Sequence, residues 1–157
     1  MSPSVVHALA FAIGLVGMEA VAWTTHRFLM HGPLWCWHRS HHEPRRGMLE
    51  TNDLFGVIFA APAIALFVVA GKLQAPALAW LAGGMTAYGA LYTLMHDGLV
   101  HRRFPLPISA HGYLGRLVQA HHLHHRTHTR KGAVSFGFLI ASDPLRLAAR
   151  LRAADRR

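Results

Sequence analysis

Histidines at repeated spacings are the residues of this chain with the clearest capacity for chemistry. Two spacings, His-x4-His and then His-x-x-His-His, occur in the first half of the chain and recur in the same order in the second half. The ten boxed residues are His26, His31, His38, His41, His42, His96, His101, His121, His124 and His125. Neutral imidazole is the commonest metal ligand among side chains. The repeat therefore predicts a metal centre to which both halves contribute.

The two spacings make different demands on a helix. His-x-x-His-His places three imidazoles on one helical face, because residues three and four apart are neighbours. In His-x4-His the two side chains diverge by about 140° at 3.6 residues per turn, so we expect a helix end or a π-bulge there. Ten ligands exceed the four that a structural zinc ion takes, which favours two metal ions close together.

The other histidines need separate treatment, since a lone histidine is commonly a core or interface residue. We assign His7 and His122 to that class, and His122 is rotated by about 100° from His121 on a helix. His111 and His128 stay open as residues that support the ligands.

Acidic residues are candidates to hold a ligand imidazole through its second ring nitrogen. Glu43, Asp53 and Asp97 are so placed, although each is equally suited to be a helix cap or a solvated charge. Glu19 lies seven residues before His26, about two turns away on the same face. Three interpretations of Glu19 stay open: it lines a polar cavity below the metal, its side chain extends to the membrane surface, or it makes an uncharged structural hydrogen bond. A charged carboxylate near mid-bilayer would carry a free-energy cost of ~2.5–3.5 kcal/mol.

Three apolar runs are long enough to cross a bilayer, which takes about 20 residues of helix. They cover residues 5–23, 54–71 and 75–95, and the short link at residues 72–74 suits a tight hairpin. Residues 133–141 are apolar but too short to cross, so we expect a buried, interfacial or re-entrant segment. The predicted fold is one all-α membrane domain over residues 1–157, with three transmembrane helices and a histidine-rich helical cap at residues 26–42 and 96–128.

Composition and charge fit a membrane protein. The chain is 52% hydrophobic and carries 16 Lys and Arg against 7 Asp and Glu, a formal net charge of +9. Apart from Lys72, the basic residues follow the first or the third run, so the positive-inside rule places the histidine boxes in the cytoplasm and the N-terminus outside. This topology and anionic lipid explain the charge, and no nucleic-acid motif accompanies it. The single Cys36 excludes an intramolecular disulfide and a Cys-based metal centre.

The sequence segments around the histidine boxes are similar to those of a known protein family. HRFLMHG, HRSHHEPRRG, ETNDLFGVIFA, GMTAYGALYTLMHDGLVHRR and VSFGFL resemble the bacterial β-carotene hydroxylase family, within the membrane fatty acid hydroxylase and sterol desaturase superfamily. The likeness runs from the first apolar run to Ala141. The histidine pattern indicates the superfamily, and the intervening strings indicate the carotenoid group.

The resemblance implies a non-haem diiron monooxygenase of the bacterial inner membrane. Its substrate would be β-carotene, hydroxylated at ring carbon 3 to give zeaxanthin through cryptoxanthin, with O2 and two external electrons per hydroxylation. The ten boxed histidines would be the iron ligands, whereas His122 occupies a variable position. The resemblance also implies ferredoxin as electron donor, and a basic cytoplasmic face would attract such an acidic carrier, although topology alone explains the same charges.

Chemistry argued from the residues agrees with these expectations. An unactivated ring C–H offers a hydrolytic zinc centre nothing to polarise, so a redox metal must activate dioxygen. No acidic residue begins a Glu-x-x-His motif, which leaves an all-nitrogen site, and imidazole suits iron as well as zinc, so a purified sample can carry zinc. The apolar runs would form a cleft for the polyene and exclude water. No flavin, nicotinamide or haem motif is present, so the electrons must come from another protein.

Other functions fit parts of the pattern. A carotenoid ketolase or a lipid hydroxylase or desaturase would use a similar scaffold and differ in its product. From another class, a His-rich metal transporter would place its ligands near the midplane of its spans, whereas these boxes follow the spans.

Overall fold

The computed structural model describes residues 1–44, 47 and 49–155, and the described residues form helices and loops without a β-strand. The α-helices are α1 (Pro3–Thr24), α2 (Trp35–His42), α3 (Leu54–Leu73), α4 (Pro76–Thr93), α5 (Gly112–His124) and α6 (Pro144–Asp155). The π-helices η1 (Thr25–Met30) and η3 (Leu94–Val100) continue α1 and α4, and the 3-10 turn η2 (Thr51–Asp53) leads into α3. The prediction of an all-α fold is confirmed for the described residues.

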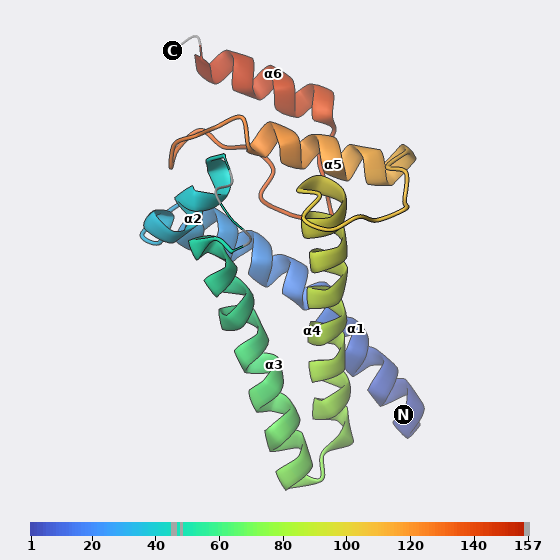
Figure 1. Cartoon of the computed structure of the whole chain (residues 1–157). Helices are drawn as coiled ribbons and strands as arrows, with labels where there is room; N and C mark the ends of the chain where they lie inside the picture. Colours follow the sequence, from blue (N-terminus) through green and yellow to red (C-terminus); the bar gives the residue numbers. More distant parts are fainter. Residues whose placement is uncertain (45–46, 48, 156–157) are drawn as a thin grey trace.

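Helices α1, α3 and α4 form an apolar stalk, in which α4 packs against both α1 and α3 (Figure 1). Glycines bring α1 and α4 close together. A Cβ at Gly14 would overlap the carbonyl oxygen of Leu81, and one at Gly84 would overlap that of Phe11. Small residues of this kind allow close backbone approach between helices in a membrane.

Two helical stretches in the described part of the chain have the length and composition of a membrane span, Pro3–Met30 and Thr51–Leu73. They correspond to the first two predicted runs. Helix α4 covers the third run but does not meet the same criterion, so its crossing of a membrane stays a prediction. Outward side chains of α1 and α3 are apolar, with Val16 66% and Val57 67% exposed, as expected for surfaces that face lipid.

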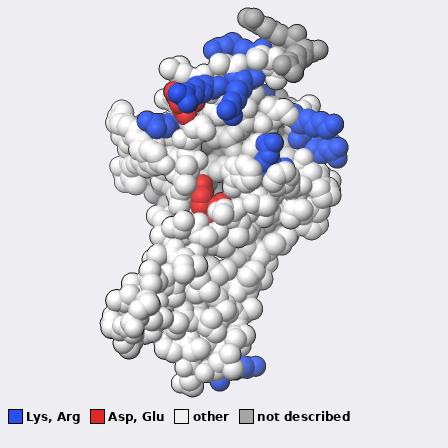
Figure 2. Space-filling model, turned by 180° about the vertical axis from the view of Figure 1, so that it is seen from behind, with Lys and Arg blue, Asp and Glu red and all other residues white. Residues whose placement is uncertain are grey.

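The two ends of the stalk differ. The N-terminus and the α3–α4 turn lie toward one end, and α2, α5 and α6 form a cap at the other (Figure 1). The turn is tight because Gln74 adopts a left-handed conformation and Pro76 starts α4, as the predicted hairpin requires. Figure 2 shows Lys and Arg gathered over the cap, with a smaller basic patch at the opposite end and a largely uncharged surface between them.

The cap carries the histidine boxes. Both His-x4-His pairs lie at π-helices, where the His31 N–H donates to the His26 carbonyl at 3.0 Å and the His101 N–H donates to the His96 carbonyl at 2.9 Å. These bonds span five residues, so of the two expected alternatives, a helix end and a π-bulge, the π-type distortion is present, and His31 and His101 follow directly at the end of each π-helix. Helices α2 and α5 carry the His-x-x-His-His boxes.

Residues 127–140, here called the strap, join α5 to α6 without regular secondary structure. The strap includes most of the apolar segment at residues 133–141, which forms a largely half-buried loop over the histidines. Helix α6 follows and packs on α5 through Leu147 and Leu151. This helix was not predicted, because its short apolar stripe is interrupted by arginines.

Candidate metal centre

The ten boxed histidines meet in the cap as two groups of five, and within each group the potential ligand atoms lie within 4.8 Å of one another. Group one consists of His26, His31, His38, His42 and His124. Group two consists of His41, His96, His101, His121 and His125. The middle histidine of each His-x-x-His-His box therefore joins the group formed mainly by the other half of the chain.

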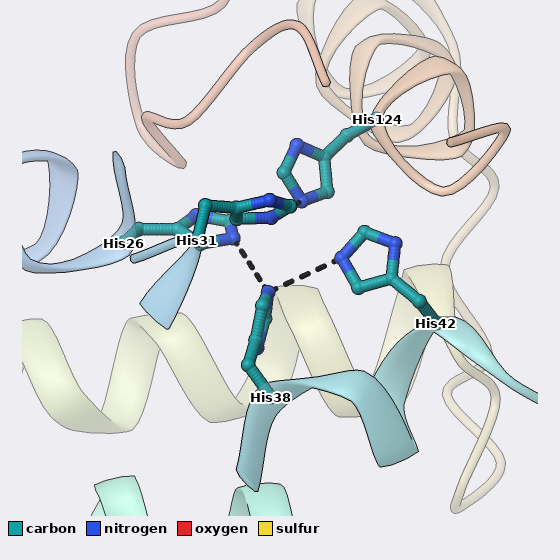
Figure 3. A group of neighbouring side chains, drawn as sticks. All are labelled: His26, His31, His38, His42 and His124. Carbon is teal, nitrogen blue, oxygen red and sulfur yellow. Dashed lines mark hydrogen bonds between the residues drawn. The ribbon is translucent and has the colours of Figure 1, made fainter. Parts of the chain in front are cut away.

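In group one the imidazoles point their Nε2 atoms toward a common centre (Figure 3). The Nε2 atom of His38 lies 3.1 Å from that of His26 and 3.2 Å from that of His42. The Nε2 atoms of His31 and His124 are 3.1 Å apart. These side chains come from η1 and its C-terminal end, from the nearby α2 and from the distant α5, so both halves of the chain contribute to one site.

Each group-one imidazole also has an oxygen beside its outer nitrogen, Nδ1. Four of these oxygens are backbone carbonyls of the strap, and the fifth is the side-chain amide of Asn52, 2.7 Å from His38. The strap pairs are His26 with Phe136 at 3.0 Å, His31 with Arg130 at 3.2 Å, His42 with Thr127 at 2.8 Å and His124 with Val134 at 2.8 Å.

The outer bonds fix the state of the inner nitrogens. A carbonyl oxygen accepts and cannot donate, so Nδ1 carries the hydrogen, and a neutral imidazole then has a lone pair at Nε2. In His31 and His124 two such lone pairs face each other at 3.1 Å. This arrangement is repulsive by itself and favourable around a cation, so the donor set fits a metal ion.

Group two has the same inward geometry with a different support. The Nε2 atoms of His41 and His96 are 2.9 Å apart, and those of His121 and His125 are 2.8 Å apart. The Nε2 atom of His101 is buried without a hydrogen-bond partner among the described residues. Unpaired buried nitrogens are rare in proteins, and a metal ion would satisfy this one.

Carboxylates hold two imidazoles of group two from outside. His96 Nδ1 lies 2.7 Å from Asp97 Oδ1, and His41 Nδ1 lies 3.2 Å from Glu50 Oε2. The Arg103 guanidinium lies 3.6 Å from Asp97 and 3.4 Å from Glu50, and it donates to Asp53 at 2.7 Å. One cation therefore ties together the carboxylates that orient the ligands.

Burial favours the neutral form of several boxed histidines of the cap. It is the main cause that lowers the pKa of His38 to about 2, that of His101 to about 3 and that of His42 to about 4, with neighbouring imidazoles adding to the effect. The pKa is also lowered, for the same leading reason, in His31, His41, His121, His124 and His125. Neutral imidazole is the form that binds metal, so these residues are ready ligands at neutral pH.

The acidic candidates have different positions. Asp97 contacts a boxed imidazole as predicted. Asp53 bonds instead to Arg103 and to the Glu50 N–H, at 2.9 Å. Glu43 pairs with Arg39 at 3.0 Å on the surface.

Glu19 is buried, and its carboxylate accepts hydrogen bonds from Tyr88 and from three backbone N–H groups of the strap. Of the three interpretations of Glu19, the geometry is that of a structural hydrogen-bond acceptor.

The remaining histidine candidates lie outside both groups. His128 Nδ1 donates to the His42 carbonyl at 2.7 Å, so it holds the backbone of a group-one histidine. His111 is exposed and bonds to Ser109. His122 lies outside both groups, as its helical position predicts, but it is exposed on α5 and is therefore not a core residue.

Sequence reasoning missed several supporting groups. Glu50 and Asn52 contact boxed imidazoles, and their only signal was a polar run directly before an apolar run. Arg103 gave no signal beyond its charge. The strap carbonyls had none, because every residue carries the same carbonyl.

A cleft of about 1040 Å³ opens between the helices of the stalk and ends at the two groups. Most of its wall is apolar, with Phe59 and Phe67 from α3 and Met18 from α1. His26 of group one and His96 and His121 of group two line the same cleft. An elongated apolar molecule in the cleft would therefore reach both groups.

Comparison of the sequence with known proteins shows the family to which the chain belongs. The chain is 51% identical over 148 residues to a β-carotene hydroxylase of Pseudescherichia vulneris, covering 94% of this chain and 84% of that protein. It is 48% identical over 147 residues to one from Pantoea ananas, covering 93% and 83%. The β-carotene 3-hydroxylase 1 of Arabidopsis thaliana chloroplasts is 46% identical over 141 residues, covering 87% of this chain and 45% of the plant protein. No solved structure gives a significant match. Residues 11–144, which include all ten boxed histidines, match the fatty acid hydroxylase family, and the chain belongs to that family.

Proposed function

We propose that this chain is a β-carotene 3-hydroxylase that converts β-carotene to zeaxanthin through cryptoxanthin. The observation that carries the proposal is the junction of the apolar cleft with two five-imidazole groups. The identity of about 50% to β-carotene hydroxylases over most of the chain names the substrate.

Groups one and two would each hold one iron ion, through the Nε2 atoms. Bound iron would supply the activation of O2, which an unactivated C–H bond requires and which the side chains here lack. Each turnover would insert one oxygen atom of O2 into the ring C–H bond. Two electrons and two protons would reduce the other oxygen atom to water. Imidazole sites also bind zinc, generally more tightly than ferrous iron, so a purified sample can carry zinc without contradicting the proposal.

The chain itself binds, orients and excludes water. The apolar wall of the cleft would seat the polyene, whose ring would enter between His26 and His96. Hydrogen bonds at Nδ1 hold the imidazole rings in place, so the nitrogens that would bind iron are oriented before substrate arrives. The same apolar wall keeps water from the oxidant.

Electrons would come from a ferredoxin-type protein. Exposed arginines lie on the cap side, and an acidic carrier would associate with them faster at low salt. They are Arg116, Arg126, Arg130, Arg146, Arg150 and Arg152. A turnover rate with ferredoxin that falls as salt rises supports this docking surface, and a salt-independent rate contradicts it.

The orientation follows from the same charges. We propose a single domain over residues 1–157 with three spans in a bacterial inner membrane, the histidine cap in the cytoplasm and the N-terminus outside. Reporter fusions at Gln74 and after Arg157 should report opposite sides of the membrane. The same side for both would contradict the three-span topology.

Pigment analysis tests the function. Cells that make β-carotene should accumulate zeaxanthin and cryptoxanthin when they express this chain, and a His96→Ala variant should leave β-carotene unchanged. A keto product would indicate a ketolase, and unchanged carotenoids with altered lipids would indicate a lipid hydroxylase or desaturase.

A further inference from the structure

The strap is the main outer support of group one. Carbonyls of Thr127, Arg130, Val134 and Phe136 receive the Nδ1 hydrogens of four of its five imidazoles. The strap has no helical or sheet hydrogen bonds of its own, and Ser135 has a positive φ of 60°. Something outside the strap must therefore fix its path.

Glu19 supplies three hydrogen bonds to the strap, while the Tyr113 hydroxyl adds one to the Leu139 carbonyl. The Oε1 atom of Glu19 accepts from the N–H groups of Phe138, Leu139 and Ile140 at 2.8, 3.0 and 3.1 Å. Its Oε2 atom accepts from the Tyr88 hydroxyl at 2.7 Å. Glu19 is 7% exposed and belongs to an apolar span, where a carboxyl group persists only with such partners.

The contact between Glu19 and the strap has no spare room. A Cβ at Gly137 would lie 2.9 Å from Glu19 Oε1, 3.0 Å from the Ile140 carbonyl oxygen and 3.4 Å from Trp23. Glycine therefore lets three consecutive N–H groups close around one carboxylate oxygen. Phe136, whose carbonyl receives the His26 hydrogen, directly precedes this glycine.

We propose that Glu19 is a positioning residue for the metal of group one. It acts through the strap, holding the carbonyls where the Nδ1 atoms need them, and has no contact with the metal itself. In group two, Glu50 and Asp97 contact the Nδ1 atoms of His41 and His96 instead, and the strap meets this group through the Phe138 ring rather than through its carbonyls. Loss of Glu19 should therefore weaken the metal position of group one more than that of group two. This inference rests on the proposed two-metal function.

Metal counting in purified full-length protein tests the inference. Wild type reconstituted with Mn²⁺ should bind two ions per chain and give the electron paramagnetic resonance signal of a coupled pair. Glu19→Ala should bind about one ion and give the signal of an isolated Mn²⁺, with unchanged helical content. Glu19→Gln should keep two ions, because its amide oxygen can accept the same three hydrogens.

A second pair of variants guards against misfolding of Glu19→Ala. Gly137→Ala perturbs the same contact from the strap side and should also lose the coupled signal. Gly17→Ala is the matched control, since its Cβ on α1 has no heavy atom within 4 Å, and it should keep two ions.

Two results would overturn the role of Glu19. One is a coupled pair that persists in both Glu19→Ala and Gly137→Ala. The other is loss of both ions together with helical content in these two variants, which would mean a general folding role. The wild-type count tests the two-metal function separately, because the inference concerns only the difference between variant and wild type.

Discussion

Groups one and two hold the same number of imidazoles but support them differently. Around group one the outer acceptors are neutral, four strap carbonyls and the Asn52 amide. Around group two, the outer acceptors are the carboxylates of Glu50 and Asp97, and the Arg103 guanidinium pairs with both of them. A carboxylate makes the imidazole it accepts from a stronger donor to metal.

The difference predicts that the two proposed metal positions are not equivalent. Group two should bind its metal more tightly and favour a higher metal charge, because two of its ligands are backed by carboxylates. Group one should respond most to displacement of the strap. His41, from the first half of the chain, belongs to group two, and His124, from the second half, belongs to group one. Neither half of the chain therefore completes a group alone.

The largest expected effect comes from removing His41 or His124, the histidine that each half of the chain contributes to the other group. His41→Ala and His124→Ala should each abolish β-carotene hydroxylation while the protein stays in the membrane, because one ligand is lost from a five-imidazole site. His41→Ala should deplete metal in group two, and His124→Ala in group one. Product analysis at matched protein levels with metal counting checks both, and near-normal hydroxylation by either variant would refute the ligand assignment.

A smaller effect should follow from removing a carboxylate. Asp97→Asn makes the support of group two resemble that of group one, and loss of such a partner typically costs about 10–100-fold in metal affinity. Titration of metal-free protein should show one weakened site and one unchanged site. The matched control is Asp143→Asn, whose carboxylate accepts from the Leu145 N–H at the start of α6. Equal weakening of both sites by Asp97→Asn would show that the groups are not independent.

Acid should destabilise the metal-free protein through both groups. The unfolded chain protonates these histidines near pH 6.5, whereas burial holds the pKa of His42 at about 4 and that of His101 at about 3 in the fold. The unfolded state thus binds more protons below pH 6.5, so stability is complete above that pH and falls as the pH decreases toward the folded values. At about pH 5.5, each such histidine should lower the free energy of unfolding by about 1.4 kcal/mol relative to its value at neutral pH.

Thermal unfolding in detergent at about pH 7.5 and pH 5.5 measures this loss. The midpoint should fall in acid, and bound metal should protect, since protons and metal compete for the same nitrogens. An acid-insensitive midpoint without metal would show that the cap histidines take up protons as readily in the folded state as in the unfolded chain.

Much of this arrangement was predictable from local patterns. The pattern of the ten histidines and the tight turn near Gln74 follow from spacing, hydropathy and turn length. Spacing also limited the His-x4-His pairs to a helix end or a π-bulge. Residues with no periodic signal were not predictable. The strap partners of Glu19 lie 119 to 121 residues away along the chain. The assignment of His41 and His124 to their groups depends on how α2 and α5 approach each other.

The smallest effect is expected at His122, which tests the register of the second His-x-x-His-His box. On α5, His121 shares a face with His124 and His125, and both His121 and His124 are buried while His122 is exposed. His122→Ala should therefore keep most hydroxylase activity and both metal ions, whereas His121→Ala should lose activity and deplete group two. Conversion of β-carotene at matched protein levels, with metal counted per chain, measures the contrast. An inactive, metal-poor His122→Ala beside a functional His121→Ala would place the ligand face one residue away from the face that points into group two.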